Sequence, residues 1–179
     1  MKNFLKINGR QRGFAMTEVI LAIVIAVAGI VGGIVLFGNA QLGMNTSDAS
    51  RAAVNISSEA RALKRTAPSF AADAASGSAA LSAATLVAAG GVSPNLLEGT
   101  TIVLPYDGTV ALAPNATDNQ TFDMTLTWAP GSKASALCSR LAQPPQNGGV
   151  GPMGTDYVIA AATDCANTTN PVLVATYRR

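Results

Sequence analysis

The strongest constraint on the fold is an apolar run near the amino terminus. Val19 to Phe37 form 19 consecutive residues without a charged or strongly polar side chain. As a helix this run would span about 28 Å, close to the thickness of the hydrocarbon core of a bilayer. The residue just before it, Glu18, is acidic, and no further charge occurs until Asp48. The sequence therefore predicts a membrane-length helix with a carboxylate at its entrance.

Charge is divided unevenly along the chain. Residues 1–13 contain four basic side chains and no acidic one, whereas residues 14–179 contain eight basic and ten acidic side chains, a formal charge of −2. Cationic segments next to an apolar helix remain on the cytoplasmic side of a membrane, so residues 1–13 are expected there and the rest is expected to be translocated. The translocated part has no excess of basic residues, and no nucleic-acid partner is predicted.

Glu18 distinguishes three interpretations of the apolar run. A cleaved secretory signal peptide would end near the small residues Gly38 to Ala40, and a permanent signal anchor would keep the run intact. Burying the Glu18 carboxylate at the edge of an apolar segment costs free energy unless it has a partner of opposite charge. Neither the signal-peptide nor the signal-anchor interpretation provides such a partner. Cleavage after Gly13 would create an α-amino group on Phe14, one helical turn from Glu18. That amino group, from the same or a neighbouring chain, could pair with the carboxylate.

The stretch "RG-FAMTE-VILAIVIAVAGIVGG" resembles the amino-terminal signature of type IV prepilins and related pseudopilins. The motif that carries the resemblance covers only about 25 residues. It implies that Gly13 precedes the prepilin peptidase cut and that Phe14 becomes the N-methylated amino terminus. Glu18 would neutralise the terminus of a neighbouring subunit during assembly. The 13-residue leader favours the type IVb group, while glycines replace the proline that many members have in the apolar stretch.

Beyond the run, residues 42–66 continue as an amphipathic helix that Pro68 ends. The residues expected to face a sheet are Ala49, Ala52, Val54, Ile56, Ala60 and Leu63. The residues expected to face solvent are Asp48, Arg51, Glu59, Arg61, Lys64 and Arg65. Together, the apolar run and the amphipathic segment predict one long helix from Phe14 to about Thr66. The predicted segments are a cleaved leader (1–13), a membrane or filament-core helix (14–41), an amphipathic half (42–66) and a globular domain (67–179).

The globular domain is predicted to contain mostly strands. A short helix is expected near residues 81–87, and Asp107-Gly108 in "PYDG" predicts a hairpin between 100–104 and 109–113. Alternation over 121–128 places Phe122, Met124, Leu126 and Trp128 in the core. A helix over 132–142 and a final strand beginning at Pro171 complete an α+β fold, and the segment 157–165 between them brings Cys165 into place. Because alanine is abundant and aromatic residues are only 5%, we expect a core of small side chains.

Two cysteines, Cys138 and Cys165, lie in this domain. An even number in an exported chain favours a disulfide, and two free buried thiols are the alternative. A disulfide closing a loop of 26 residues would stabilise the fold by roughly 3 to 4 kcal/mol. The resemblance implies the same pairing, since pilins have a disulfide-closed carboxyl-terminal region. Surface loops within 143–156 and 163–170 are the expected partner contacts.

The residue types present exclude most catalytic chemistry. Histidine is absent, which removes the commonest general base and metal ligand, and two cysteines alone make a zinc site improbable. No phosphate-loop, dinucleotide-binding or nucleophile-elbow motif occurs. Asp118 and Asp123 match no calcium loop of defined geometry and are expected in a solvated turn that enters a strand. The chain is therefore predicted to be no enzyme, with no catalytic residue, cofactor or metal.

The resemblance implies a structural function. The expected protein is a subunit that prepilin peptidase and an inner-membrane assembly machinery convert into a homo-oligomeric extracellular type IV pilus. A pseudopilin of a type II-like secretion system would share the amino-terminal features, and the two cysteines argue against it. A signal-anchored periplasmic binding protein would keep its leader and form no filament.

Overall fold

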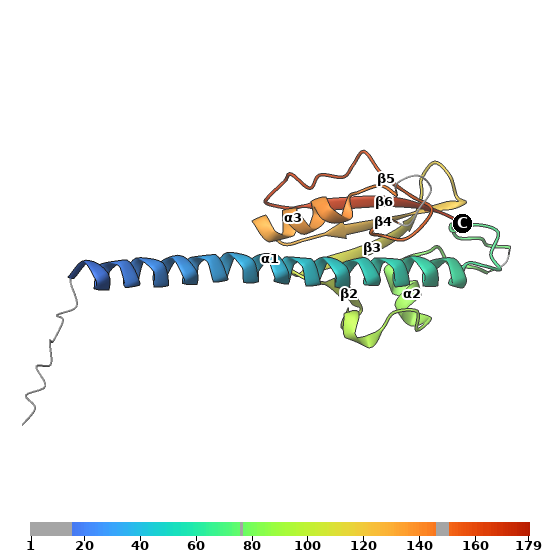
Figure 1. Ribbon diagram of the computed structural model, residues 1–179. Helices are drawn as coiled ribbons and strands as arrows, with labels where there is room; N and C mark the ends of the chain where they lie inside the picture. The colour runs from blue at the N-terminus through green and yellow to red at the C-terminus, as the bar shows by residue number, and fades with distance from the viewer. Residues whose placement is uncertain (1–15, 76, 146–150) are drawn as a thin grey trace, which may run out of the picture. The chain divides into compact units, whose positions relative to one another are not determined.

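The computed structural model describes residues 16–75, 77–145 and 151–179. The chain divides into two compact units, residues 1–41 and 42–179. Helix α1 (Met16–Leu63) contributes its first part to one unit and its second part to the other. The predicted α+β class is confirmed, with a long apolar helix followed by an antiparallel sheet (Figure 1).

The second unit contains a six-stranded sheet in the order β1-β2-β3-β4-β6-β5, with every neighbouring pair antiparallel. The strands are β1 (Leu97–Glu98), β2 (Thr101–Leu104), β3 (Gly108–Pro114), β4 (Thr121–Thr127), β5 (Tyr157–Ile159) and β6 (Val172–Arg178). The remaining helices are α2 (Ala83–Ala88), the 3₁₀ turn η1 (Pro94–Leu96) and α3 (Ser132–Leu141).

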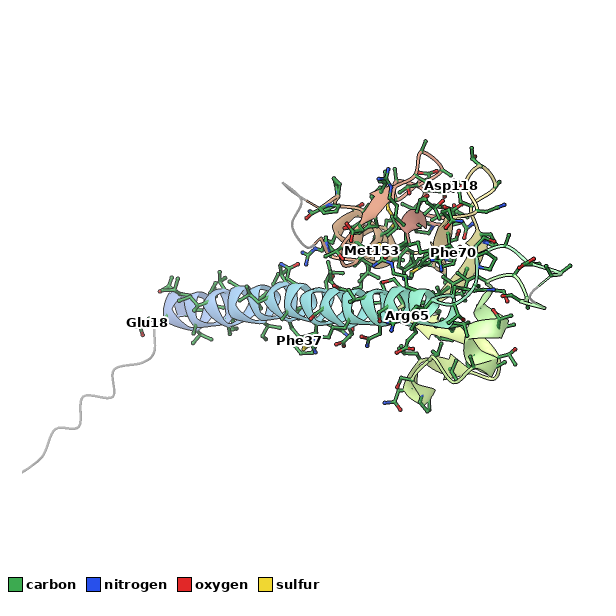
Figure 2. All side chains as sticks on the ribbon, turned by 90° about the vertical axis from the view of Figure 1, so that its right-hand side faces the viewer. Glu18, Phe37, Arg65, Phe70, Asp118 and Met153 are labelled. Atoms are coloured by element: carbon green, nitrogen blue, oxygen red, sulfur yellow. A yellow bond between two sulfur atoms is a disulfide. The ribbon has the colours of Figure 1, made fainter. Side chains whose placement is uncertain are left out.

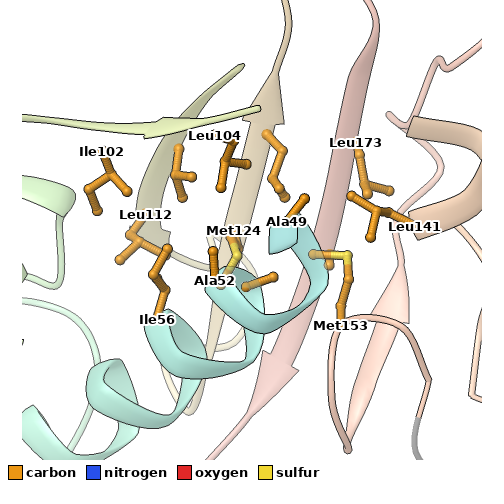
Figure 3. Packing of buried hydrophobic residues seen from close by; sticks show 14 of the residues in the cluster. Ala49, Ala52, Ile56, Ile102, Leu104, Leu112, Met124, Leu141, Met153 and Leu173 are labelled. Atoms are coloured by element: carbon orange, nitrogen blue, oxygen red, sulfur yellow. The ribbon is translucent and has the colours of Figure 1, made fainter. Parts of the chain in front are cut away.

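The second part of α1 lies against the sheet through small side chains. Its buried residues are Ala49, Ala52, Ala53, Ile56, Ser57 and Ala60, most of them alanines, and Figure 3 shows Ala49, Ala52 and Ile56 near Leu112 and Met124 of the sheet. Two predicted core residues are wrong: Val54 is only half-buried and Leu63 is 37% exposed. The side of the helix that faces the sheet follows spacings of three and four residues from Ala49 to Ala60, and Val54 lies outside it. Leu63 continues that spacing, three residues after Ala60, but it is the last residue of the helix and remains exposed.

On the sheet side the core contains larger residues than composition suggested. The alternation in β4 is confirmed, since Phe122, Met124 and Leu126 are buried and Trp128 follows them into the core. The ring of Phe122 stacks on that of Tyr177, with 5.1 Å between centroids, and also contacts Phe70 at 4.8 Å. Phe70, Phe122 and Tyr177 therefore pack together in the core.

The β2–β3 hairpin forms where predicted, but its turn differs. Tyr106 and Asp107 have the positive φ values, 62° and 53°, whereas Gly108 already belongs to β3 and pairs with Leu104. A Cβ at Gly108 would lie 2.6 Å from Cδ1 of Trp128. The glycine is therefore required for close contact with the indole ring rather than for the turn itself.

Most other elements lie close to their predicted positions. α2 begins after Ser82, whose hydroxyl accepts from the backbone N–H of Thr85 at 3.1 Å, while the Thr85 hydroxyl accepts from the backbone N–H of Ser82. α3 and β6 agree with prediction within about one residue. α1 ends at Leu63 rather than near Thr66, and its predicted start at Phe14 lies outside the described residues. The short elements β1, η1 and β5 were not predicted.

Candidate functional site

The first part of α1 exposes apolar side chains on all sides. Thirteen large apolar residues between Val19 and Phe37 are exposed, from 47% at Val19 to 71% at Leu36. Figure 2 shows side chains projecting around the helix between the labelled Glu18 and Phe37. A helix that is apolar all round, rather than along one stripe, requires an apolar environment on every side. α1 is long enough and apolar enough to cross a membrane, and the mean hydropathy of its most apolar 18 residues is 3.1.

Glu18 lies in the first turn of α1 and is exposed. A carboxylate there interacts favourably with the partial positive charge at a helix amino terminus. Its side chain forms no hydrogen bond or ion pair with any residue between 16 and 179 that the structure describes. The predicted cleavage site at Gly13 and Phe14 lies outside the described residues, and so does the predicted amino-group partner of Glu18.

Glycines within α1 do not interrupt the helix, which is continuous from Met16 to Leu63. A Cβ built at Gly29, Gly32 or Gly33 would meet no atom within 4 Å. No contact with a described residue therefore requires these glycines. Such positions allow the backbone of another helix to approach closely.

The two cysteines that the sequence analysis paired are joined. Cys138 on α3 forms a disulfide with Cys165, and their Cα atoms are 5.4 Å apart. The segment after Cys165 turns around Asn167, whose Oδ1 accepts from the backbone N–H groups of Thr169 and Asn170 at 3.0 and 3.1 Å. The disulfide thus fastens the loop before β6 to the buried face of α3.

Part of the predicted contact loop 143–156 is held inside the unit instead of lying free. The carbonyl of Pro152 accepts a hydrogen bond from Ser50 of α1, and Met153 is buried in the core. The Tyr157 hydroxyl donates to the carbonyl of Gln143 at 2.6 Å. Residues 146–150 lie outside the described part. The expectation of an exposed loop is therefore wrong for Met153 and for its neighbour Gly154, which is also buried.

Lys64 was expected to face solvent at the basic end of the helix, and this prediction is wrong. It is only 5% exposed, and its Nζ donates to Ser78 Oγ at 2.7 Å and to the carbonyl of Ala79. Burial lowers the pKa of the Lys64 ammonium group. Lys64 follows Ala60 by four residues and therefore lies on the same, sheet-facing side. That spacing is the sequence signal that could have identified it.

Near the carboxyl-terminal end of α1, Arg61 and Arg179 each donate hydrogen bonds to backbone carbonyl groups. Arg179 donates to the carbonyls of Arg65 at 2.9 Å, Pro68 at 3.1 Å and Lys64 at 3.4 Å. These carbonyls belong to the segment that follows the last helical residue, Leu63, so the guanidinium holds this turn, and its positive charge complements the helix dipole. Arg61 donates to the carbonyl of Arg178 at 2.9 Å, and its guanidinium carbon lies 5.6 Å from the Tyr177 ring centroid. Sequence reasoning missed Arg179.

Asp118 and Asp123 take part in local hydrogen bonds. Asp118 Oδ1 accepts from the backbone N–H of Gln120 at 2.9 Å, as expected for a turn. Asp123 lies within β4, where Asn115 Nδ2 donates to both its oxygens at 3.0 Å and Thr176 Oγ1 donates to Oδ1 at 2.6 Å. In the part of the chain that the structure describes, no three His, Cys, Asp or Glu residues are grouped as metal ligands.

Comparisons do not assign this arrangement to a known group: the chain matches no protein-family model, no curated protein and no solved structure.

Proposed function

We propose that this protein is a structural subunit of a type IV pilus, of type IVb-like character. The observation that carries the proposal is the first part of α1, apolar on every side and preceded by Glu18, in a chain that continues into a compact disulfide-bonded α+β unit. One apolar segment of this kind suits two environments in turn. It lies in the inner membrane before assembly and among copies of itself afterwards.

Proteolytic removal of the leader is the step that allows subunits to assemble. Prepilin peptidase cuts after Gly13 and removes the cationic leader, and Phe14 becomes the N-methylated terminus. Glu18 supports this assignment because its carboxylate has no partner among the described residues. An α-amino group from a neighbouring subunit supplies the missing positive charge in an apolar setting. The pair then sets the register between adjacent helices.

Cohesion of the filament follows from the exposed apolar surface. Fully burying one valine, leucine or isoleucine side chain contributes roughly 1.5 to 3 kcal/mol, and α1 exposes thirteen large apolar residues between Val19 and Phe37. In lipid these residues are already covered, so a subunit leaves the membrane only when other helices cover them. Gly29, Gly32 and Gly33 allow those helices to pack closely. Assembly therefore needs an inner-membrane machinery and yields an extracellular homo-oligomer.

Electron microscopy of material sheared from the native host tests this function. Antibodies raised against residues 42–179 should label filaments. Labelling confined to membrane vesicles would contradict the proposal and would instead support a signal-anchored binding protein. A pseudopilin is the remaining alternative, and long surface filaments at natural expression levels would exclude it.

A further inference from the structure

A groove lined by polar and apolar residues runs along the second part of α1. Two adjoining hollows of about 390 and 220 Å³ share the lining residues Asn55, Ser93 and Leu96. One wall is α1 and the other is the segment around η1. Buried Ile56 and Val92 border the groove, while its outer residues are exposed.

The groove has an acidic side chain at each end, and its net negative charge lies at the Glu59 end. Asp48 lies at one end and Glu59 at the other, with Arg51 close to Asp48, which leaves a formal charge of −1. All three side chains are exposed, and none forms an ion pair or hydrogen bond with a described residue. No contact with another described residue of the unit accounts for these charges. They are available to a partner that presents positive charge.

Helix α3 has the complementary surface. Its buried side comprises Ala134, Leu137, Cys138 and Leu141, and its exposed residues include Lys133 and Arg140. The helix contains no acidic residue, so this exposed side has a formal charge of +2. Neither basic side chain is bonded to a described residue.

These two surfaces lie toward opposite edges of the same sheet. α3 packs on β6, which is next to the edge strand β5, whereas η1 and α2 pack on β2, next to the edge strand β1. The groove of one copy can therefore receive α3 of another copy only in a head-to-tail arrangement. Head-to-tail contacts that do not close into a ring produce open helical filaments.

The geometry points to a contact between copies of this chain in which the α1–η1 groove of one subunit binds the exposed side of α3 of the next. Lys133 lies near Glu59, and Arg140 lies toward Asp48. Seven residues of helix separate the two cations by about 10 Å and eleven separate the two acids by about 16 Å. The flexible stems of lysine and arginine span the difference. This contact rests on the proposed function, because it orders globular units around the filament core.

Carbodiimide cross-linking of intact filaments tests the contact, because it joins a carboxylate directly to an amine. Residues 14–179 contain two lysines, Lys64 and Lys133, and Lys64 is buried. Lys133 is therefore the reporter. We expect covalent dimers on a denaturing gel, with peptides that join Lys133 to Glu59 or Asp48. The variant Lys133→Arg keeps the charge without the reactive amine, so it should form filaments but lose these dimers.

Charge reversal provides the second measurement. Lys133→Glu should lower the yield of filaments, and adding Glu59→Lys to the same chain should restore it. Dimers that join Lys133 to another carboxylate, such as Asp118 or Asp156, would overturn the contact but leave the pilus function intact. Absence of any filament from the unsubstituted protein would overturn the proposed function and this contact with it.

Discussion

The Tyr177 hydroxyl donates a 3.0 Å hydrogen bond to the carbonyl oxygen of Met153. Met153 belongs to the loop that precedes β5, and Tyr177 lies near the end of β6, so the bond fixes a buried loop residue to the sheet. Burial raises the pKa of the Tyr177 hydroxyl, and the neighbouring Tyr157 raises it further. At a pH above about 10, the usual tyrosine pKa, the folded protein therefore keeps the hydroxyl proton of Tyr177 while the unfolded chain releases it.

Tyr177→Phe should lower the free energy of unfolding at neutral pH by about 1 kcal/mol through loss of this hydrogen bond. Because the folded pKa is raised, the stability that Tyr177 contributes is fully present below pH of about 10 and is lost as the pH rises above it. The variant should therefore lose less stability across that range than the unsubstituted protein. Urea unfolding in detergent at several pH values measures both effects.

Tyr106→Phe is the matched control. It removes a buried hydroxyl that has no hydrogen-bond partner in the described structure, so it should not lower the free energy of unfolding. Equal alkaline losses in Tyr177→Phe and in the unsubstituted protein would contradict the pKa assignment.

Removing the disulfide by Cys138→Ala with Cys165→Ala should destabilise the second unit by about 3 kcal/mol, because the bond restricts the unfolded chain. The expected result is a lower midpoint of urea unfolding than in the unsubstituted protein. Ser139→Ala changes an exposed neighbour on α3 and serves as control. An unchanged midpoint in the double variant would show that the disulfide adds no stability.

Arg179→Ala should lower the free energy of unfolding by about 1 to 2 kcal/mol, because the carbonyls at the end of α1 lose a charged donor. Arg178→Ala is a close control, since the Arg178 side chain is exposed and makes no hydrogen bond to a described residue. Thermal unfolding of both variants would show whether the position of the guanidinium matters. If Arg179→Ala and Arg178→Ala lose the same free energy of unfolding, the hydrogen bonds of Arg179 add no stability beyond that of its positive charge.

Glu18→Gln should abolish filaments while the subunit still accumulates in the membrane, because the amide cannot pair with a neighbouring α-amino group. Sheared fractions and membranes are compared on the same immunoblot. Glu98→Gln removes an exposed acid from β1 and should leave filament yield unchanged. Normal filaments from Glu18→Gln would remove the assembly role proposed for this carboxylate.

Local patterns predicted the regular elements well. The alternation that ends at Trp128, the hairpin signal at Asp107 and the breakers around α3 each depend on neighbouring residues, and these elements formed close to where the sequence placed them. The cysteine pair was also predicted, because two cysteines permit one connection within a chain.

Contacts between distant segments could not be predicted in the same way. Arg179 satisfies carbonyls more than 100 positions earlier, and Ser50 bonds to Pro152 across a similar separation. Nothing local indicates such partners, because they follow from how β6 and the loop before β5 meet α1. The burial of Lys64 lies between these cases: its spacing from Ala60 indicates the sheet side, but its acceptors at residues 78 and 79 depend on the fold.

The amino terminus and intact mass of the mature protein, purified from the envelope of its native host, test the central proposal most directly. The proposal predicts a chain that begins at Phe14, carries one added methyl group and lacks two hydrogens because of the disulfide. A chain that begins at Met1 would contradict it and indicate a signal-anchored protein. A chain that begins at Gln41 would indicate a secreted domain released from a cleaved signal peptide.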